Sequence, residues 1–211
     1  MTAEKTGWAA KAARIISVLA HPIFIPLYGL MLLYSAPTLL SYIPFHLKKM
    51  ILVVVIADNI LLPISVAAVL YSRGAIKSIY LRERSERLFI LTFCVIMYAI
   101  TAFLLVKLPV ASLFKAYFIS VAAVTLVTML ISCFYRISLH AVGIGGLLAL
   151  TVCLTLIFNV VYVNIIAFLV LLSGIVLTSR LYLEEHKPAE AWLGLLTGAA
   201  VTGLTLFLLM G

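Results

Sequence analysis

Long apolar segments alternate with short polar ones along the whole chain, and the apolar segments set the expected architecture. A helix of about 20 predominantly apolar residues is long enough to cross the hydrocarbon core of a bilayer. Seven segments of this kind are residues 14–36, 49–72, 88–108, 111–134, 139–158, 159–179 and 189–210. The pattern predicts an all-α, polytopic transmembrane bundle of about seven spans, with six as the alternative because the turns near Pro109 and Asn159 are tight.

The composition is typical of a membrane protein. The 211 residues are 65% hydrophobic and 10% charged, with a mean hydropathy of +1.27, which is more apolar surface than a soluble domain can bury. The net charge of +8 favours anionic lipid headgroups over nucleic acid as partners, since most of the chain lies in the bilayer. No linker or internal repeat divides the chain, so residues 1–211 are expected to form one integral membrane domain.

Polar residues concentrate in three segments, 77–87, 136–140 and 179–190, and each of them follows an even-numbered span. All three are therefore expected on the membrane face that holds the N-terminus, where they can converge on one site. The positive-inside rule would make this face cytoplasmic, because it carries 11 of the 15 Lys and Arg residues. Six of the 11 belong to the suspected site, however. The remaining five, against four on the other face, leave the orientation open.

The densest polar segment, residues 179–190, contains two cations, three carboxylates and a histidine beside apolar spans. Charge in that position is costly unless it is solvated, paired or functional. Arg180 can clamp phosphate oxygens, His186 can react, and Glu190 can orient the histidine. Pro188 and Glu190 both suit the first turn of the last helix, where the dipole favours a carboxylate. The alternative is an ordinary charged loop.

The other two polar segments also suit an anion. Ser138 and His140 lie at the start of the fifth span, where backbone amides can face a ligand. A serine cap and an interfacial histidine are the alternative there. Residues 77–87 form a guanidinium-rich cluster that can bind phosphate through several donors, or a solvated loop attracted to anionic lipid.

Together, the three segments resemble one family, the type-2 phosphatidic acid phosphatases, or lipid phosphate phosphatases, which share their site with vanadium haloperoxidases. The family motifs are Lys-x6-Arg-Pro, Pro-Ser-Gly-His and Ser-Arg-x5-His-x3-Asp, in that order. The chain matches them, over about residues 77–200, as Lys77-x6-Arg84-Ser85, Ile137-Ser138-Leu139-His140 and Ser179-Arg180-x5-His186-x3-Glu190. It departs from the motifs at Ser85, Ile137, Leu139 and Glu190.

The resemblance implies a divergent membrane phosphatase that hydrolyses a lipid phosphate or diphosphate through a phosphohistidine intermediate, without a metal or other cofactor. His186 would be the nucleophile, Glu190 would orient it, and His140 would protonate the leaving group. Phosphate would be held by Lys77, Arg84, Ser138 and Arg180, with Arg82, Arg87, Arg136 and Ser179 as additional candidates. The alternatives are a catalytically inactive lipid-binding membrane protein and a small transporter that uses Asp58.

Asp58 is the only aspartate of the chain and lies beside Asn59 in the middle of the second span. At that depth an acid is a candidate for a proton or ion relay. Its other interpretation is structural, as one partner of an interhelical hydrogen bond.

Prolines and glycines refine this prediction. His21-Pro22 and Pro26 predict a kink in the first span. Gly194-x3-Gly198 predicts close helix packing, within the chain or between the protomers of a homo-oligomer. The expected location is the inner (plasma) membrane of a bacterium, with the site at one membrane–water interface. The expected partners are a lipid phosphate substrate and membrane lipids, and no nucleic acid.

Overall fold

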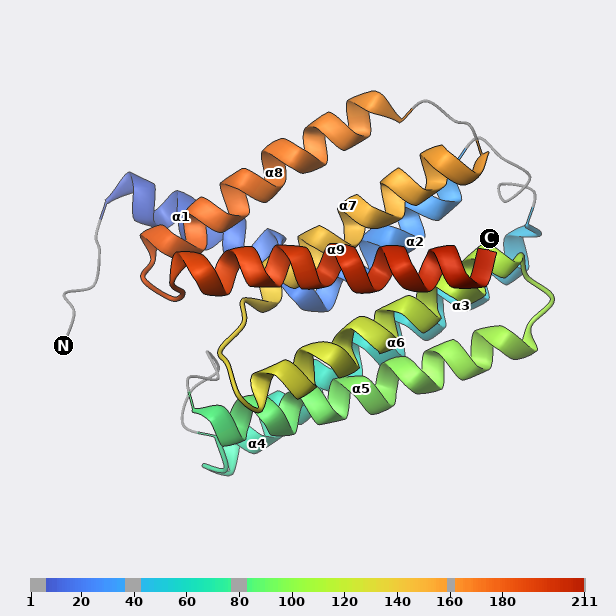
Figure 1. The fold of residues 1–211 in the computed structure, drawn as a ribbon. Coiled ribbons are helices and arrows are strands. Elements are labelled where there is room, and N and C mark those ends of the chain that lie inside the picture. Colours follow the sequence, from blue (N-terminus) through green and yellow to red (C-terminus); the bar gives the residue numbers. More distant parts are fainter. Residues whose placement is uncertain (1–6, 37–42, 77–82, 159–161, 211) are drawn as a thin grey trace.

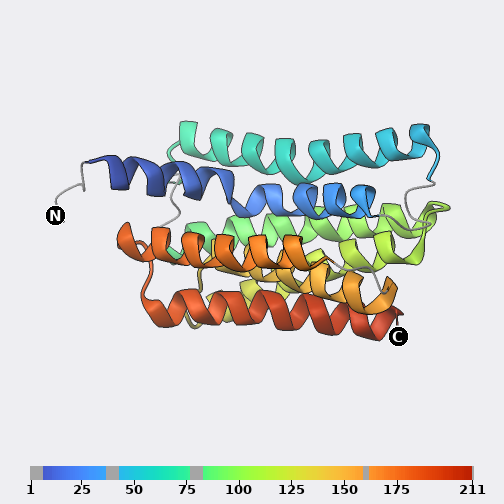
Figure 2. The same ribbon diagram turned by 90° about the horizontal axis from the view of Figure 1, so that it is seen from above.

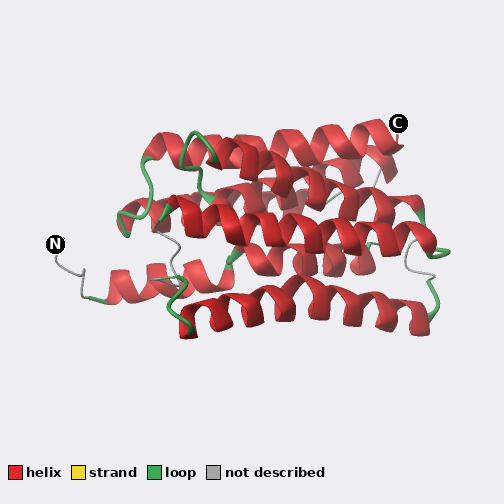
Figure 3. Cartoon of the chain, turned by 90° about the horizontal axis from the view of Figure 1, so that it is seen from below, coloured by secondary structure: helices red, strands yellow, loops and turns green. Residues whose placement is uncertain are grey.

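Seven helical segments, each long and apolar enough to cross a membrane, run back and forth along one bundle in the computed structural model of the chain (Figure 1). The structure describes residues 7–36, 43–76, 83–158 and 162–210. The spans are Trp8–Ser35, Phe45–Ser72, Arg84–Lys107, Ser112–Ser132, Leu139–Ile157, Val163–Tyr182 and Pro188–Met210. The described residues contain helices and loops and no strand (Figure 3). The predicted all-α fold is therefore confirmed, and the chain is an integral membrane protein.

The first span is broken where the sequence predicts a kink. It consists of α1 (Trp8–Leu19), a 3-10 turn η1 (Pro22–Phe24) and α2 (Ile25–Ser35). Pro22 and Pro26 lack the amide donor that a continuous helix needs, so the helix cannot run through them unchanged. The last five spans are uninterrupted helices: α5 (Arg84–Lys107), α6 (Ser112–Ser132), α7 (Leu139–Phe158), α8 (Val163–Tyr182) and α9 (Pro188–Met210).

The second span contains a π-helical turn that the apolar pattern does not predict. The turn, η3 (Ala57–Leu61), separates α3 (Phe45–Ile56) from α4 (Leu62–Ser72). It brings Asp58 and Asn59 to α5, where Thr101 Oγ1 contacts Oδ2 of Asp58 and lies 2.8 Å from Oδ1 of Asn59. The structure thus provides the interhelical hydrogen bond that was one of the two interpretations of Asp58.

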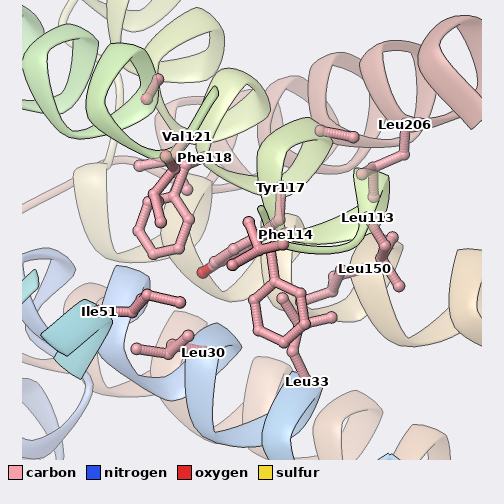
Figure 4. Close-up of a cluster of buried hydrophobic side chains, with 14 of the residues drawn as sticks. Leu30, Leu33, Ile51, Leu113, Phe114, Tyr117, Phe118, Val121, Leu150 and Leu206 are labelled. Atoms are coloured by element: carbon pink, nitrogen blue, oxygen red, sulfur yellow. The ribbon is translucent and has the colours of Figure 1, made fainter. Parts of the chain in front are cut away.

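A large apolar core joins the spans, with α3 and α4 at one edge of the bundle and α9 at the opposite edge (Figure 2). Figure 4 shows its fully buried members, which include Leu30 of α2, Phe114 of α6 and Leu150 of α7. Tyr117 lies in this core and its hydroxyl donates to the carbonyl oxygen of Ile25, 3.1 Å away. This bond ties α6 to the backbone beside the break in the first span.

Helices α7 and α9 approach each other so closely that only glycine fits at the contact. A Cβ atom at Gly198 would lie 2.0 Å from the carbonyl oxygen of Val142, and one at Gly194 would lie 2.6 Å from that of Ser138. Gly145 of α7 has an equally close backbone neighbour on α9. The predicted glycine packing is confirmed as a contact within the chain. Because α7 and α9 each begin at a polar segment, this contact fixes the two segments against one another.

The described parts of the loops that follow the second, fourth and sixth spans lie at the end of the bundle that holds the N-terminus (Figure 1). The parity of the spans predicts this arrangement. Exposed aromatic side chains lie at the ends of the spans on this side of the bundle. Such residues are common where helices leave the bilayer. They include Trp8, Tyr71, Phe134, Tyr135, Tyr182 and Trp192.

Replacement of Gly198 by alanine should destabilise the bundle, because the added methyl would overlap the carbonyl oxygen of Val142 and two helix backbones would have to separate. We expect a loss of about 1–3 kcal/mol, typical of an overpacked site, in unfolding experiments in detergent. Gly203→Ala is the matched control, since it lies in the same helix and its Cβ would meet only Ala149, at 3.9 Å. That variant should be neutral or slightly more stable. Equal effects of the two substitutions would contradict the close α7–α9 contact.

Candidate functional site

One residue or more from each polar segment takes part in a set of contacts around the loop between α8 and α9. The backbone amide of Ser138 donates to the carbonyl oxygen of Glu190 at 3.2 Å, which joins the start of α7 to the first turn of α9. Arg87, near the start of α5, donates from Nη2 to the carbonyl oxygen of Ile137. Segments that are far apart in sequence therefore meet here, as predicted.

His186 and Glu190 form the pair that their spacing predicts. Nδ1 of His186 and Oε2 of Glu190 lie 2.8 Å apart, and the two side chains are only 6% and 12% exposed. With an ionised Glu190 as acceptor, Nδ1 carries the hydrogen, so the lone pair of the neutral ring is on Nε2. The carboxylate thus selects one tautomer and one orientation of the ring.

Glu190 is itself held by the start of α9. The backbone amide of Lys187 donates to the same Oε2 atom, at 3.3 Å. Lys187 directly precedes the helix and Glu190 is its third residue, so this bond is the carboxylate half of a capping box. Pro188 occupies the first helical position, where its missing donor costs nothing. The first turn of α9 therefore holds the carboxylate of Glu190 in place, and Glu190 in turn orients the ring of His186.

The end of α8 turns the chain toward His186 through a Schellman motif. The amide of Glu185 donates to the carbonyl oxygen of Arg180 at 3.2 Å, and that of Glu184 to the carbonyl oxygen of Leu181 at 3.0 Å. Glu184 has a left-handed φ of 56°, in the position that usually holds glycine. The turn also places Glu185 near Arg180, with 3.6 Å between Oε2 and Nη2.

His186 lines a cavity of about 450 Å³ at this end of the bundle, called the first cavity below. Its lining consists of Arg136, Leu181, Glu184, Glu185, His186, Lys187, Pro188 and Glu190. Burial lowers the pKa of His186 from its usual value of 6.5. The hydrogen bond to Glu190 opposes this effect, and the positive charges of Arg180 and Arg136 lower the pKa further. Burial and the two arginines therefore favour the neutral ring, which is the state that a nucleophile needs.

The first span, which the family resemblance leaves out, also reaches the site. Ser17 of α1 accepts from two of the predicted site residues. Its Oγ accepts from Nη1 of Arg180 at 3.3 Å, and its carbonyl oxygen accepts from Nε2 of His140 at 3.0 Å. The ring of His21 packs edge-on against that of His140, with 5.4 Å between the centroids. Ser17 has no signal in the sequence, because a small polar residue in an apolar helix belongs to no motif.

Ser138, His140 and Arg180 are not among the described residues that line the first cavity. The Nε2–H of His140 points to the backbone of α1. The structure therefore connects the two histidines through Ser17, Arg180 and Glu185 and does not place both rings on the same cavity. His140 can protonate a group in the first cavity only after it releases Ser17.

Two buried donors at the site have no partner among the described residues: Oγ of Ser138 and Nε of Arg180. Buried donors without an acceptor are rare in folded proteins. Arginine and hydroxyl donors of this kind suit the oxygens of a phosphate group. These two atoms support the phosphate-binding role predicted for Ser138 and Arg180. Arg87, an additional candidate from the sequence, lines the second cavity instead.

The remaining predicted residues are placed as follows. Ser179 is buried and its Oγ donates to the carbonyl oxygen of Ile175, so the hydroxyl is used within α8. Arg84 is exposed and lines a second, smaller cavity, whereas Arg136 lines both cavities. Lys77 and Arg82 lie outside the described residues.

Comparisons of the chain with family models, with curated proteins and with solved structures give no match. The chemistry of the site is therefore inferred from its geometry. Among the described residues, no group of three or more His, Cys, Asp or Glu side chains is arranged to hold a metal ion.

Glu190→Gln should lower the pKa of His186 further, because both the hydrogen bond and the negative charge of Glu190 raise that pKa. A lower pKa means that the ring stays neutral down to a lower pH. NMR titration of the histidine ring protons in detergent micelles measures the change. Glu184→Gln is the control, since the carboxylate of Glu184 lines the same cavity but has no part in the His186 shift. An unchanged or raised midpoint in Glu190→Gln would show that the pair does not form.

Proposed function

We propose that this protein is an integral membrane phosphatase that removes a phosphate group from a lipid phosphate or diphosphate. The observation that carries the proposal is the 2.8 Å pair of His186 and Glu190 beside a cavity at one end of the bundle. The pair leaves Nε2 of a neutral ring as a nucleophile, and Arg180 and Arg136 supply positive charge next to it. Histidine, carboxylate and guanidinium groups in this arrangement are suited to phosphoryl transfer.

The reaction has two steps. In the first, the lone pair on Nε2 of His186 attacks phosphorus, the N–P bond forms, and the P–O bond to the lipid breaks. The leaving oxygen takes up a proton from protonated His140. In the second step water attacks phosphorus and gives a proton back to His140, the N–P bond breaks, and inorganic phosphate leaves a neutral His186 ring behind. Arg180 and Ser138, with their unpartnered donors, would hold the phosphate oxygens as charge develops on them. The guanidinium groups supply the positive charge, so the scheme needs no metal ion.

The proposal includes a movement of His140. The resemblance implies that this residue protonates the leaving oxygen, but in the structure its Nε2–H donates to the carbonyl of Ser17. We therefore expect the ring to release Ser17 when a substrate binds. The contact that would be lost is one hydrogen bond between α1 and α7, worth about 1 kcal/mol, which substrate binding can readily offset.

The position of the site favours a lipid substrate. The loop that carries His186 lies between two membrane spans, and exposed aromatic residues flank it at the end of α8 and the start of α9. A phosphate group at this depth can reach the first cavity while its hydrocarbon tail stays in the bilayer. The membrane thus holds the substrate beside the nucleophile.

Purified protein in mixed micelles should release phosphate from at least one member of a panel of lipid phosphates and diphosphates. His186→Ala should reduce the rate to the uncatalysed background, because the nucleophile is lost. His46→Ala is the matched control, since His46 is exposed at the start of α3, at the other end of the bundle. The proposal is wrong if the wild-type protein releases no phosphate from any lipid of the panel, or if His186→Ala retains full activity.

A change of leaving group tests His140. His140→Ala should slow hydrolysis of a lipid phosphate by about 10²–10⁴-fold, the usual contribution of a general acid. The same variant should hydrolyse p-nitrophenyl phosphate almost as fast as the wild type, because nitrophenolate leaves without a proton. If His140→Ala lowers the rates with both substrates equally, His140 does not act as the general acid, and its role is the structural contact with α1.

A further inference from the structure

A second cavity, of about 220 Å³, opens at the same end of the bundle. Its lining consists of Arg84, Arg87, Ser132, Phe134, Tyr135 and Arg136, from the start of α5, the end of α6 and the loop that follows α6. Of the described residues that line it, three are arginines and none is acidic. The lining of the first cavity, by contrast, includes three carboxylates. The second cavity is therefore the more cationic of the two.

Two residues that line the second cavity each carry a buried donor without a partner among the described residues. The donors are Nε of Arg87 and Oγ of Ser132, in residues that are 7% and 5% exposed. The guanidinium of Arg87 is held in place, because Nη2 already donates to the carbonyl oxygen of Ile137. Buried donors that are fixed but unpaired indicate that an acceptor is missing. A group with several acceptor oxygens would satisfy both of them.

The start of α5 adds to this preference for an anion. Arg84 and Arg87 belong to the first turn of a 24-residue helix, where free backbone amides and the helix dipole favour negative charge. Glu86 is in the same turn but does not line the cavity. The arginines thus act together with the helix terminus, and several charge-assisted hydrogen bonds to one phosphate group become available.

The surroundings of the cavity suit a phosphate that carries a lipid tail. Phe134 is 90% exposed and follows the fourth span, at the point where the chain leaves the bilayer. Exposed aromatic residues at this depth are typical interfacial anchors. Phe89 of α5 and Leu130 of α6, each close in sequence to a cavity residue, are also exposed and would be available to contact acyl chains. A soluble phosphate would make no use of these side chains.

We propose that the second cavity binds the phosphate of an anionic phospholipid headgroup, at a site distinct from the first cavity. Its lining includes no histidine, cysteine or carboxylate among the described residues, so it offers no nucleophile or base to attack the lipid. The bound lipid is held without being converted. This site does not depend on the proposed phosphatase activity.

The experiment titrates the full-length protein in a neutral detergent with short-chain phosphatidylglycerol, and measures Kd by isothermal titration calorimetry. Arg84→Gln should weaken binding by about tenfold, as expected for the loss of one charge-assisted contact. Arg84 is exposed, so the variant should fold normally. Ser132→Ala removes the unpartnered hydroxyl and should also weaken binding. Lys187→Gln is the matched control, because it removes one positive charge from the first cavity and should leave Kd unchanged.

Two further ligands identify the bound group. Phosphatidylcholine of the same chain length has no net charge and should bind at least about tenfold more weakly. Inorganic phosphate should compete only at much higher concentration, because it has no acyl chains. The proposal is overturned if Arg84→Gln binds phosphatidylglycerol as tightly as the wild type. It is also overturned if Lys187→Gln weakens binding as much as Arg84→Gln, or if inorganic phosphate competes at the concentrations at which the lipid binds.

Discussion

The site depends on the close contact between α7 and α9. Helices in a bilayer gain little from the hydrophobic effect, so they associate through tight packing and hydrogen bonds. Here Gly194 and Gly198 of α9 lie directly against the carbonyl oxygens of Ser138 and Val142, and the backbone bond from Ser138 to Glu190 continues the contact at the start of both helices. The two helices begin at different polar segments, so the contact that holds the bundle together also aligns the site.

Glu190 connects the α7–α9 contact to His186. Its carbonyl oxygen accepts from Ser138, and its Oε2 accepts from both His186 and the amide of Lys187. Glutamate is a typical residue at the third position of a capped helix, because its side chain reaches back to the amide that precedes the helix. The departure from the aspartate of the resembling family therefore has a structural reason. The longer side chain caps α9 and orients the histidine through one oxygen atom.

The sequence predicts the elements better than it predicts the contacts. Span lengths give the seven helices, span parity gives the common face, and the spacing of His186 and Glu190 gives their pair. The sequence could not show which of the neighbouring arginines, Arg84 or Arg87, is buried in the bundle. This depends on which face of α5 packs against the other helices, and in the structure Arg87 is buried and Arg84 is exposed. The role of Ser17 could not be predicted for a different reason. It contacts His140, which is 123 residues away in the sequence, and no motif or spacing links the two residues.

The departure at Leu139 bears on access rather than on backbone strain. A glycine in a motif can mark a left-handed conformation, but Leu139 is the first residue of α7, and Glu184 is the one non-glycine residue with positive φ in the described parts of the chain. What leucine adds is a side chain next to Ser138, whose hydroxyl is already buried without a partner. In the proposed phosphatase, a phosphate group would have to reach this hydroxyl beside the leucine side chain, and His140 would have to leave Ser17 to face the same phosphate. Both requirements concern the junction of α1 and α7, so the movement that would open the site belongs there, while the His186–Glu190 pair stays fixed by the start of α9.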